Sequence, residues 1–257
     1  MLIAGPCALE SYEQALNDAQ ECKRLGIEYF RAGAFKPRTN PNSFQGLREE
    51  GIQILSRIKE EVGIKIVTEL VSAEFLPLYK DVDIIQIGSR NCQNFELLKY
   101  VATNSNKPIL LKRGFGMTID EFIGAANYLK VYGAKEIILC ERGIKTFENA
   151  TRNTLDFAAV PIIQNKTDFK IIIDPSHGTG RRDLVIPMSK AALAIGADGL
   201  IIEATEYPDC AITDGYQTIN YKELAEIQKI YVNFYKKIWY NIYTKDKDMI
   251  TAISFIG

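Results

Sequence analysis

The chain is poor in histidine, tryptophan and cysteine, with one, one and five of these among its 257 residues. The cysteines are odd in number and scattered, at Cys7, Cys22, Cys92, Cys140 and Cys210. A disulfide-stapled secreted domain has paired cysteines at short spacings, so this pattern instead predicts reduced thiols in a cytoplasmic protein. Any chemistry that needs an imidazole must use the single histidine, His177.

Excess charge of one sign and long apolar runs are missing as well. The 31 basic and 32 acidic residues leave a formal net charge of −1, so neither a nucleic acid nor an anionic membrane is expected as a partner. No run reaches the roughly 18 apolar residues that span a bilayer. Residues 1–14 lack the basic and apolar segments of a signal peptide. With 47% hydrophobic and 25% charged residues, the sequence is typical of one large globular domain.

What the sequence does contain is a regular alternation of short apolar runs and longer amphipathic runs. The apolar runs predict strands at 2–5, 29–34, 64–70, 83–89, 108–114, 136–142, 170–176 and 199–205. The clearest helical patterns between them cover 11–26, 47–63, 94–105 and 118–133. Gly26, Gly63, Gly133 and Gly196 each fall just past a helical run, where a left-handed cap favours glycine.

Strands that alternate with helices in this way run parallel and are joined by crossovers. Eight such units in about 230 residues predict an α/β fold of the (β/α)8 TIM-barrel type. We expect a single domain, with the catalytic barrel over 1–235 and a C-terminal tail over 236–257. A doubly wound open sheet is the alternative, although no Gly-rich dinucleotide fingerprint follows the first strand.

Most of the predicted strands end in polar residues that a plain connecting loop does not need. The cations among them are Arg31, Lys36, Arg90, Lys112, Arg113 and Arg142, and Glu141 accompanies the last of these. In a barrel, the C-terminal ends of the strands form the active-site face, so these cations would converge on one mouth. Pairing with surface carboxylates explains any one of them, but gathered like charges repel unless an anion neutralises them. The pattern predicts a small ligand that carries phosphate and carboxylate groups.

A second set of polar residues follows the first, seventh and eighth predicted strands, which are neighbours once a barrel closes. It consists of Cys7, His177, Glu203 and Asp214. A thiolate, an imidazole and two carboxylates together suit a divalent transition metal. Taken singly, each also has a structural interpretation: Cys7 as a buried free thiol, His177 as a hydrogen-bonded loop residue, and the carboxylates as solvated charges.

The segment GAFKPRTNPNSFQG, residues 33–46, contains charged and hydroxyl side chains that a turn does not require. Glycine, proline and asparagine suit a loop. Lys36, Arg38 and Thr39 are not needed for turning the chain, and two cations beside a hydroxyl indicate an anion-binding role.

A series of motifs resembles the 3-deoxy-D-arabino-heptulosonate-7-phosphate (DAHP) synthase family, of the compact type I-beta kind. The motifs are AGPCALES, FRAGAFKPRTNPNSFQG, IQIGSRNCQNFELL, PILLKRG, ILCERG, DPSHGTGRRDLVIP and GLIIEATEYPDCAITDGYQ, in that order over roughly residues 2–235. The resemblance implies a (β/α)8 barrel that condenses phosphoenolpyruvate (PEP) with erythrose 4-phosphate, the first step of the shikimate pathway and of aromatic amino acid biosynthesis. It also implies a homo-oligomer, a tetramer or a dimer.

The resemblance assigns roles to the two sets of residues. For PEP binding it implies Arg31, Lys36, Arg90, Lys112 and Arg142, and for the aldose phosphate Pro37, Arg38 and Thr39. Cys7, His177, Glu203 and Asp214 match the ligands of a divalent metal, Mn²⁺, Co²⁺, Zn²⁺ or Fe²⁺. Lys112, Cys7 and His177 are the catalytic candidates, Lys112 for proton transfer because crowded cations lose protons more readily. Thr205 departs from the family pattern, which has a His or similar residue there, so the packing beside Glu203 is expected to differ.

Two other functions are compatible with these residues. One is 3-deoxy-D-manno-octulosonate-8-phosphate synthase, which uses arabinose 5-phosphate and whose aldose loop resembles KANRS rather than the KPRT of residues 36–39. The other is a catalytically silent barrel that binds a phosphorylated ligand and regulates a partner.

Two expectations concern the ends of the chain. Because Met1 lies just before the first predicted strand, we expect no added regulatory domain and no feedback inhibition by Phe, Tyr or Trp. The tail carries many apolar residues, so we expect it to pack under the barrel or into an oligomer interface.

Overall fold

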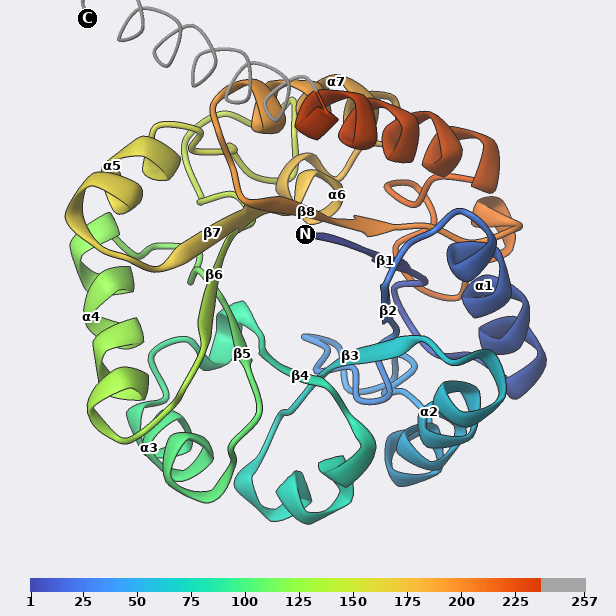
Figure 1. The fold of residues 1–257 in the computed structure, drawn as a ribbon, viewed down its shortest axis with the longest axis horizontal. Coiled ribbons are helices and arrows are strands. Elements are labelled where there is room, and N and C mark those ends of the chain that lie inside the picture. The colour runs from blue at the N-terminus through green and yellow to red at the C-terminus, as the bar shows by residue number, and fades with distance from the viewer. Residues whose placement is uncertain (237–257) are drawn as a thin grey trace, which may run out of the picture.

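The computed structural model describes residues 1–236, and eight short parallel strands form its centre. The strands are β1 (Leu2–Gly5), β2 (Tyr29–Arg31), β3 (Lys65–Glu69), β4 (Ile84–Ile87), β5 (Ile109–Lys112), β6 (Ile137–Glu141), β7 (Lys170–Ile173) and β8 (Gly199–Glu203). They pair in chain order, and β8 pairs with β1 to close the ring (Figure 1). The predicted (β/α)8 barrel is confirmed, and the open-sheet alternative is wrong.

Helices surround this ring on its outside (Figure 1). The α-helices are α1 (Tyr12–Arg24), α2 (Arg48–Val62), α3 (Phe95–Asn104), α4 (Ile119–Val131), α5 (Ala159–Lys166), α6 (Pro175–Thr179) and α7 (Arg182–Ala194). Short 3₁₀ segments are η1 (Ala73–Asp81), η2 (Ser89–Asn91) and η3 (Pro208–Cys210). Residues 221–236 form a further helix between α7 and α1, which completes the outer layer.

Local sequence sets where the helices begin and end. Ser11 and Thr118 precede α1 and α4, and each side-chain oxygen accepts a hydrogen bond from a backbone N–H of the first turn. Gly26, Gly63, Gly133 and Gly196 have φ values of 75°, 68°, 105° and 89°, in the left-handed region that glycine adopts without a steric penalty. The predicted glycine caps are therefore confirmed.

The barrel has two apolar layers because side chains alternate along each strand. The inner layer fills the barrel with Ile3, Val67, Ile84, Leu110, Ile138, Cys140, Ile172 and Ile201. The outer layer is larger and packs the other strand faces against the helices. Each buried Leu, Ile, Val or Phe side chain stabilises the fold by roughly 1.5–3 kcal/mol. This packing fixes the strand ends, and with them the loops that carry the polar residues.

The connection from β3 to β4 differs from the others. It is η1, a 3₁₀ segment that contains Pro77, instead of an α-helix. Pro77 has no backbone N–H to donate to an α-helical hydrogen bond. Of the helices that the structure describes, none is both long and apolar enough to cross a bilayer. Residues 237–257 lie outside the described part, so the boundary at 235 and the packing of the tail stay predictions.

Candidate active site

The C-terminal ends of the strands surround a polar cavity of about 290 Å³. Its lining consists of Lys36, Pro37, Arg38, Thr39, Asn40, Ser43, Glu69, Arg90, Phe115, Arg142, Arg152, His177 and Asp214. The structure thus brings together cations from the loops after β2, β4 and β6, as the strand-end pattern predicts. The cavity is large enough for small phosphorylated molecules, and its walls are mainly positive.

Of the four residues expected to hold a metal, His177 and Asp214 line this cavity, and Cys7 and Glu203 lie beside them. Ligand atoms of Cys7, His177, Glu203 and Asp214 all lie within 4.8 Å of one another. Cys7 Sγ is 3.2 Å from Asp214 Oδ2, and His177 Nε2 is 3.1 Å from Glu203 Oε1. One sulfur, one nitrogen and two carboxylate groups that face a common point are a donor set that fits a divalent transition metal.

The backbone near Asp214 is adapted to this arrangement. Asp214 has a φ of 54°, a left-handed conformation that aspartate tolerates better than most residues. The next residue, Gly215, lies so close to Pro208 that a Cβ atom would come within 2.3 Å of the Pro208 carbonyl oxygen. The loop after β8 is therefore folded tightly enough to return Asp214 to the barrel mouth.

His177 is held by Asp174, which precedes the short helix α6. Asp174 Oδ1 accepts a hydrogen bond from the His177 backbone N–H at 2.9 Å, and Asp174 Oδ2 lies 2.8 Å from His177 Nδ1. This contact leaves Nε2 to face the other three residues. Burial lowers the pKa of His177, despite the opposing effect of Asp174 and Glu203, and so favours the neutral imidazole that a metal requires.

Glu203 is held from two sides. Arg31 Nη1 donates to Glu203 Oε1 at 2.9 Å, and Gln217 Nε2 donates to Glu203 Oε2 at 2.5 Å. Burial alone would raise the pKa of Glu203, but His177 and Arg31 outweigh it and lower that pKa. Arg31 also donates to the Pro6 carbonyl at 2.8 Å and is not among the lining residues. Arg31 therefore contacts Glu203 in the structure, and its predicted role in binding PEP stays a prediction.

Cys7 lies beside a lysine. Lys36 Nζ is 2.9 Å from Cys7 Sγ and 3.0 Å from the Cys7 carbonyl oxygen. Burial, with Glu203 and Asp214, raises the pKa of Cys7 to about 12, against the opposing effect of Lys36 and Arg31. Without a bound cation the thiol keeps its proton, so metal binding would have to displace it.

The segment 33–46 forms the wall next to Lys36. Its two ends are joined by backbone hydrogen bonds, from Lys36 N–H to the Gln45 carbonyl and from Arg48 N–H to the Ala34 carbonyl, both at 2.8 Å. Pro37, Arg38 and Thr39 all line the cavity. The residues expected to bind the aldose phosphate are thus on the same cavity as the metal-type group.

The cations that line the cavity include a buried group without a partner. Arg142 is 3% exposed, and its Nη1 has no hydrogen-bond partner. In residues 1–236, Arg142 Nη1, Asn153 Oδ1 and Thr213 Oγ1 are the buried side-chain polar atoms without a partner. All three belong to loops at the barrel mouth. Because an unpaired buried polar group is unfavourable, the unpaired nitrogen of Arg142, which lines the cavity, indicates that the cavity receives a polar ligand.

Side-chain alternation separates the polar residues at the ends of β5 and β6. Lys112 points inward, and its Nζ is 2.6 Å from Asp174 Oδ2. Arg113 points outward and pairs with Glu141 at 2.8 Å and with Asp156 at 2.9 Å. Arg113 and Glu141 therefore form a buried structural pair and do not face the cavity. Lys112, our candidate for proton transfer, has a carboxylate partner rather than only cations around it.

Several residues around the cavity escaped the sequence analysis. They are Glu69, Phe115, Arg152, Asp174 and Gln217. Glu69 ends β3, so the same strand-end rule could have found it. Asp174 lies in the quoted DPSHGTG motif. Arg152 lies in the long loop after β6, where no local pattern marks it, and its Nη1 reaches the Gln217 side-chain oxygen at 3.0 Å.

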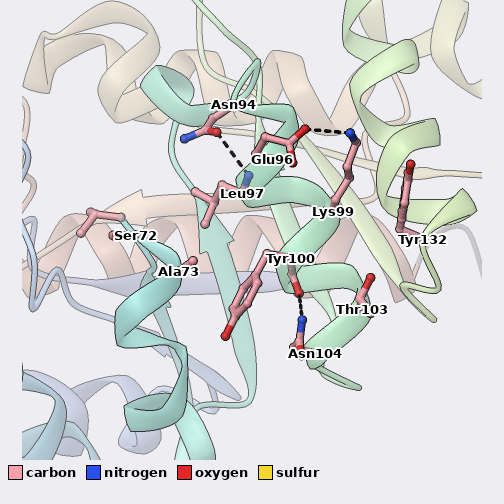
Figure 2. A pocket seen from close by; sticks show the side chains of 11 residues that line it. Ser72, Ala73, Asn94, Glu96, Leu97, Lys99, Tyr100, Thr103, Asn104 and Tyr132 are labelled. Atoms are coloured by element: carbon pink, nitrogen blue, oxygen red, sulfur yellow. Dashed lines mark hydrogen bonds and ion pairs between the residues drawn. The ribbon is translucent and has the colours of Figure 1, made fainter.

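A larger cavity, of about 610 Å³, lies on the outer layer around α3 (Figure 2). Its charged and amide side chains are paired in part, for example Lys99 with Glu96 at 2.7 Å and Asn104 with the Tyr100 carbonyl at 2.8 Å. None of the buried unpaired atoms in residues 1–236 lies there. The smaller cavity at the barrel mouth is therefore the better candidate for chemistry.

Comparison with known proteins agrees with this geometry. The model of the DAHP synthetase I family matches residues 1–238. The chain belongs to this family. A phospho-2-dehydro-3-deoxyheptonate aldolase from Thermotoga maritima is 50% identical over 227 residues, which are 88% of this chain and 67% of that protein. A crystal structure of that enzyme class from the same organism superposes with a TM-score of 0.89 at 47% identity, over 93% of this chain and 70% of the other.

The other branch of the resemblance is more distant. A 2-dehydro-3-deoxyphosphooctonate aldolase from Trichlorobacter lovleyi is 29% identical, over 89% of this chain and 90% of that protein. The resemblance to the DAHP synthases is confirmed, and the heptonate branch of the relatives is favoured over the octonate branch.

Within this member of the DAHP synthetase I family, Thr205 has an identifiable partner. Its Oγ1 donates to the Asp18 carboxylate, with both oxygens at 3.0 Å, and Tyr221 OH donates to Asp18 Oδ1 at 2.6 Å. Asp18 is on α1 and 1% exposed. Thr205 therefore links the loop after Glu203 to α1 and to the last helix, which accounts for the packing at this unusual position.

Asp18 gives a stability prediction. Burial raises its pKa to about 7, despite the hydrogen bonds from Tyr221 and Thr205, so the fold favours the protonated carboxyl. Between about pH 4 and 7 the folded chain holds a proton that the unfolded chain lacks, and the free energy of unfolding falls as pH rises through this range. The free energy of unfolding of Asp18→Asn should equal that of the wild type at pH 5. At pH 8 it should exceed the wild-type value by about 2–4 kcal/mol.

Urea unfolding at the two pH values measures this difference. Asp183→Asn, an exposed aspartate in the first turn of α7, is the control and should leave the pH dependence unchanged. An Asp18→Asn protein with the wild-type pH profile would contradict the prediction.

Proposed function

We propose that the protein is a DAHP synthase, which converts PEP, erythrose 4-phosphate and water into 3-deoxy-7-phosphoheptulonate and inorganic phosphate. One observation carries this proposal: a single cavity is lined by the KPRT segment, by Arg142 with its unpaired guanidinium nitrogen, and by His177 and Asp214 of the four-residue metal-type group. Such a cavity supplies cations for two phosphorylated substrates and a place for a metal at their meeting point. The product then continues toward the aromatic amino acids.

The two ends of the cavity divide the substrates between them. Lys36, Arg90 and Arg142 bind the phosphate and carboxylate of PEP, while Arg38 and Thr39 bind the phosphate of the aldose. Arg142 Nη1 has no partner in the protein, and a PEP oxygen would supply one. Pro37 restricts the backbone between the two groups of cations and so fixes the separation of the substrates. Holding both reactants in register supplies several kcal/mol of the lowering of the barrier.

The residues around Cys7 serve the aldehyde. Cys7, His177, Glu203 and Asp214 would hold a divalent metal, Mn²⁺, Co²⁺, Zn²⁺ or Fe²⁺, which acts as a Lewis acid toward the aldehyde oxygen when bound. Arg31 donates a hydrogen bond to Glu203 and so positions that carboxylate. Asp174 orients His177 and pairs with Lys112, so Lys112 lies next to the site where a proton must move.

The preference for the aldose tests the function directly. Erythrose 4-phosphate should exceed arabinose 5-phosphate in kcat/KM by at least about 100-fold, because an extra hydroxymethylene would displace the sugar phosphate from Arg38 and Thr39. Steady-state assays with PEP and each sugar measure this ratio. Comparable values would favour the octulosonate synthase, and no turnover with either sugar would favour a silent, ligand-binding barrel.

Arg38→Ala should raise the KM for erythrose 4-phosphate roughly 10- to 100-fold, the effect of losing a charged hydrogen bond, and should leave the KM for PEP within about twofold. Arg24→Ala removes an exposed arginine that pairs with Glu21 on α1, and serves as the control. An Arg38→Ala protein in which both KM values rise equally would contradict the assignment of this end of the cavity.

Assembly and location complete the proposal. We propose a homo-oligomer, a tetramer or a dimer, in the cytoplasm, on the strength of the family resemblance. Analytical ultracentrifugation of the purified protein tests the first part.

A further inference from the structure

Phe115 is the only Phe, Tyr or Trp residue among those that line the cavity at the barrel mouth. It follows Gly114 in the loop after β5 and is half-buried. An aromatic ring in a wall made of arginines, a lysine, amides and carboxylates calls for a physical reason, because it offers no hydrogen bond to a phosphorylated ligand. The surroundings of the ring provide that reason.

Two guanidinium groups face this ring. Arg142 Cζ lies 4.6 Å from the ring centroid, and Arg90 Cζ lies 5.9 Å from it. Both distances are within the roughly 6 Å at which a cation is attracted to the negative face of an aromatic ring. The attraction is stronger where water is excluded, and Arg142 is 3% exposed. Phe115 is thus a shared neighbour of two cations from different strands.

The ring offsets two unfavourable features of the ligand-free site. Arg142 Nη1 is buried without a hydrogen-bond partner, and Arg90 and Arg142 carry like charges that repel. Burial lowers the pKa of Arg142, which records how poorly this charge is solvated. The negative face of the ring stabilises both guanidinium groups in their charged form and in their positions at the cavity. Because the ring does not neutralise their charge, both arginines stay available to bind an anion.

The backbone holds the ring firmly. Arg113 donates to the Met117 carbonyl through Nε at 3.1 Å and Nη2 at 2.8 Å, which closes the turn that contains Phe115. The Phe115 carbonyl accepts a hydrogen bond from the Lys145 N–H at 2.8 Å. This bond ties the turn to the loop that follows Arg142. The position of the ring relative to Arg142 is therefore set by the fold.

We infer that Phe115 is a positioning residue of the PEP site, which holds Arg90 and Arg142 in the geometry that grips the PEP phosphate. This inference rests on the proposed function. The residue acts through the two arginines and leaves the aldose end of the cavity unaffected. Its effect comes from the charge distribution of the ring as well as from its volume.

The test separates these two contributions. Phe115→Leu removes the ring and keeps an apolar side chain, and Phe115→Tyr keeps the π face. Incorporation of mono-, di- and trifluorinated phenylalanine at position 115 keeps the shape and progressively weakens the negative face. Phe147→Leu, at a fully exposed phenylalanine in the loop after β6, is the matched control. The readouts are the dissociation constant of PEP by calorimetry on the metal-loaded full chain, and the KM of each substrate.

Phe115→Leu should weaken PEP binding about tenfold, with the KM for erythrose 4-phosphate within twofold of the wild type. Each added fluorine should weaken PEP binding further. Phe115→Tyr, which keeps the π face, should bind PEP as tightly as the wild type. Unchanged PEP binding across the fluorinated series would overturn the inference, as would an equal rise of both KM values. A wild type that binds PEP but turns over neither sugar would instead refute the proposed function, and the fluorinated series would still decide the role of Phe115.

Discussion

Removal of divalent metal is expected to lower the condensation activity below about 1% of that of the untreated protein, and Mn²⁺, Co²⁺ or Zn²⁺ should restore it. The reason lies in Cys7, His177, Glu203 and Asp214, whose ligand atoms lie within 4.8 Å of one another. Two carboxylates and a thiol this close are best satisfied by a shared cation. Because burial raises the pKa of Cys7 to about 12, metal binding must release the thiol proton, and affinity should fall as pH falls.

Dialysis against a strong chelator, followed by elemental analysis and assay, measures this requirement. Cys7→Ser should weaken metal binding and remove the thiolate-to-cobalt charge-transfer band of the Co²⁺-loaded protein. Cys210→Ser, at an exposed cysteine, is the matched control and should change neither. Full activity in protein shown to be metal-free would refute the proposed metal requirement.

The arrangement of strands was predictable because two local signals agree. The apolar runs mark the strands, and glycines such as Gly63 and Gly133 mark where helices must end. The least predictable connection was that between β3 and β4, which is the 3₁₀ segment η1 with Pro77 inside it instead of an α-helix. Competing short-range preferences decide such a segment, and periodicity does not resolve them.

The residues of the candidate site were predictable, but the directions in which their side chains point were less so. Knowing that strands end together is enough to place Lys112, Arg113 and Arg142 at the mouth. It does not say which of two consecutive side chains points inward, since that depends on strand register and tilt. The outward position of Arg113 beside Glu141, and the position of Arg31 beneath Glu203, both follow from this alternation.

Residues from long loops were the hardest to predict. Arg152 lies in the long loop between β6 and α5, residues 142–158, which no periodicity describes. Its side chain reaches Gln217, and Asp214 Oδ1 at 3.4 Å, only because the loop folds back over the mouth. Phe115 is a second example, since a phenylalanine after a strand reads as ordinary core until the two arginines around it are seen.

Asp174→Asn is expected to lower metal affinity or kcat roughly 10- to 100-fold, the usual effect of losing a group that orients a metal-binding histidine. One carboxylate oxygen accepts hydrogen bonds from Lys112 at 2.6 Å and approaches His177 Nδ1 at 2.8 Å. Asparagine can keep the cap on α6, because its single oxygen can accept from the His177 backbone N–H. The same oxygen cannot also accept hydrogen bonds from Lys112 and from the imidazole, so the buried ammonium of Lys112 loses its partner.

The same substitution should change acid stability in a predictable direction. Burial would raise the pKa of Asp174, but His177 and Lys112 outweigh it and hold that pKa well below the usual range. A carboxyl with a depressed pKa stabilises the fold above about pH 4, and this contribution is lost as pH falls further. Asp174→Asn should therefore be less stable than the wild type near pH 7, and the difference should shrink in acid.

The control is Asp120→Asn, at an exposed aspartate in the first turn of α4 whose ion pair with Lys166 lies on the surface. It should leave kcat and metal affinity within about twofold of the wild type and should leave the acid unfolding profile unchanged, because exposed ion pairs contribute little to stability. Titration with Co²⁺ and acid unfolding of both variants provide the comparison. If Asp174→Asn bound metal as tightly as Asp120→Asn and turned over as fast, Asp174 would serve only to begin α6, and the orientation of His177 would have to come from elsewhere in the barrel mouth.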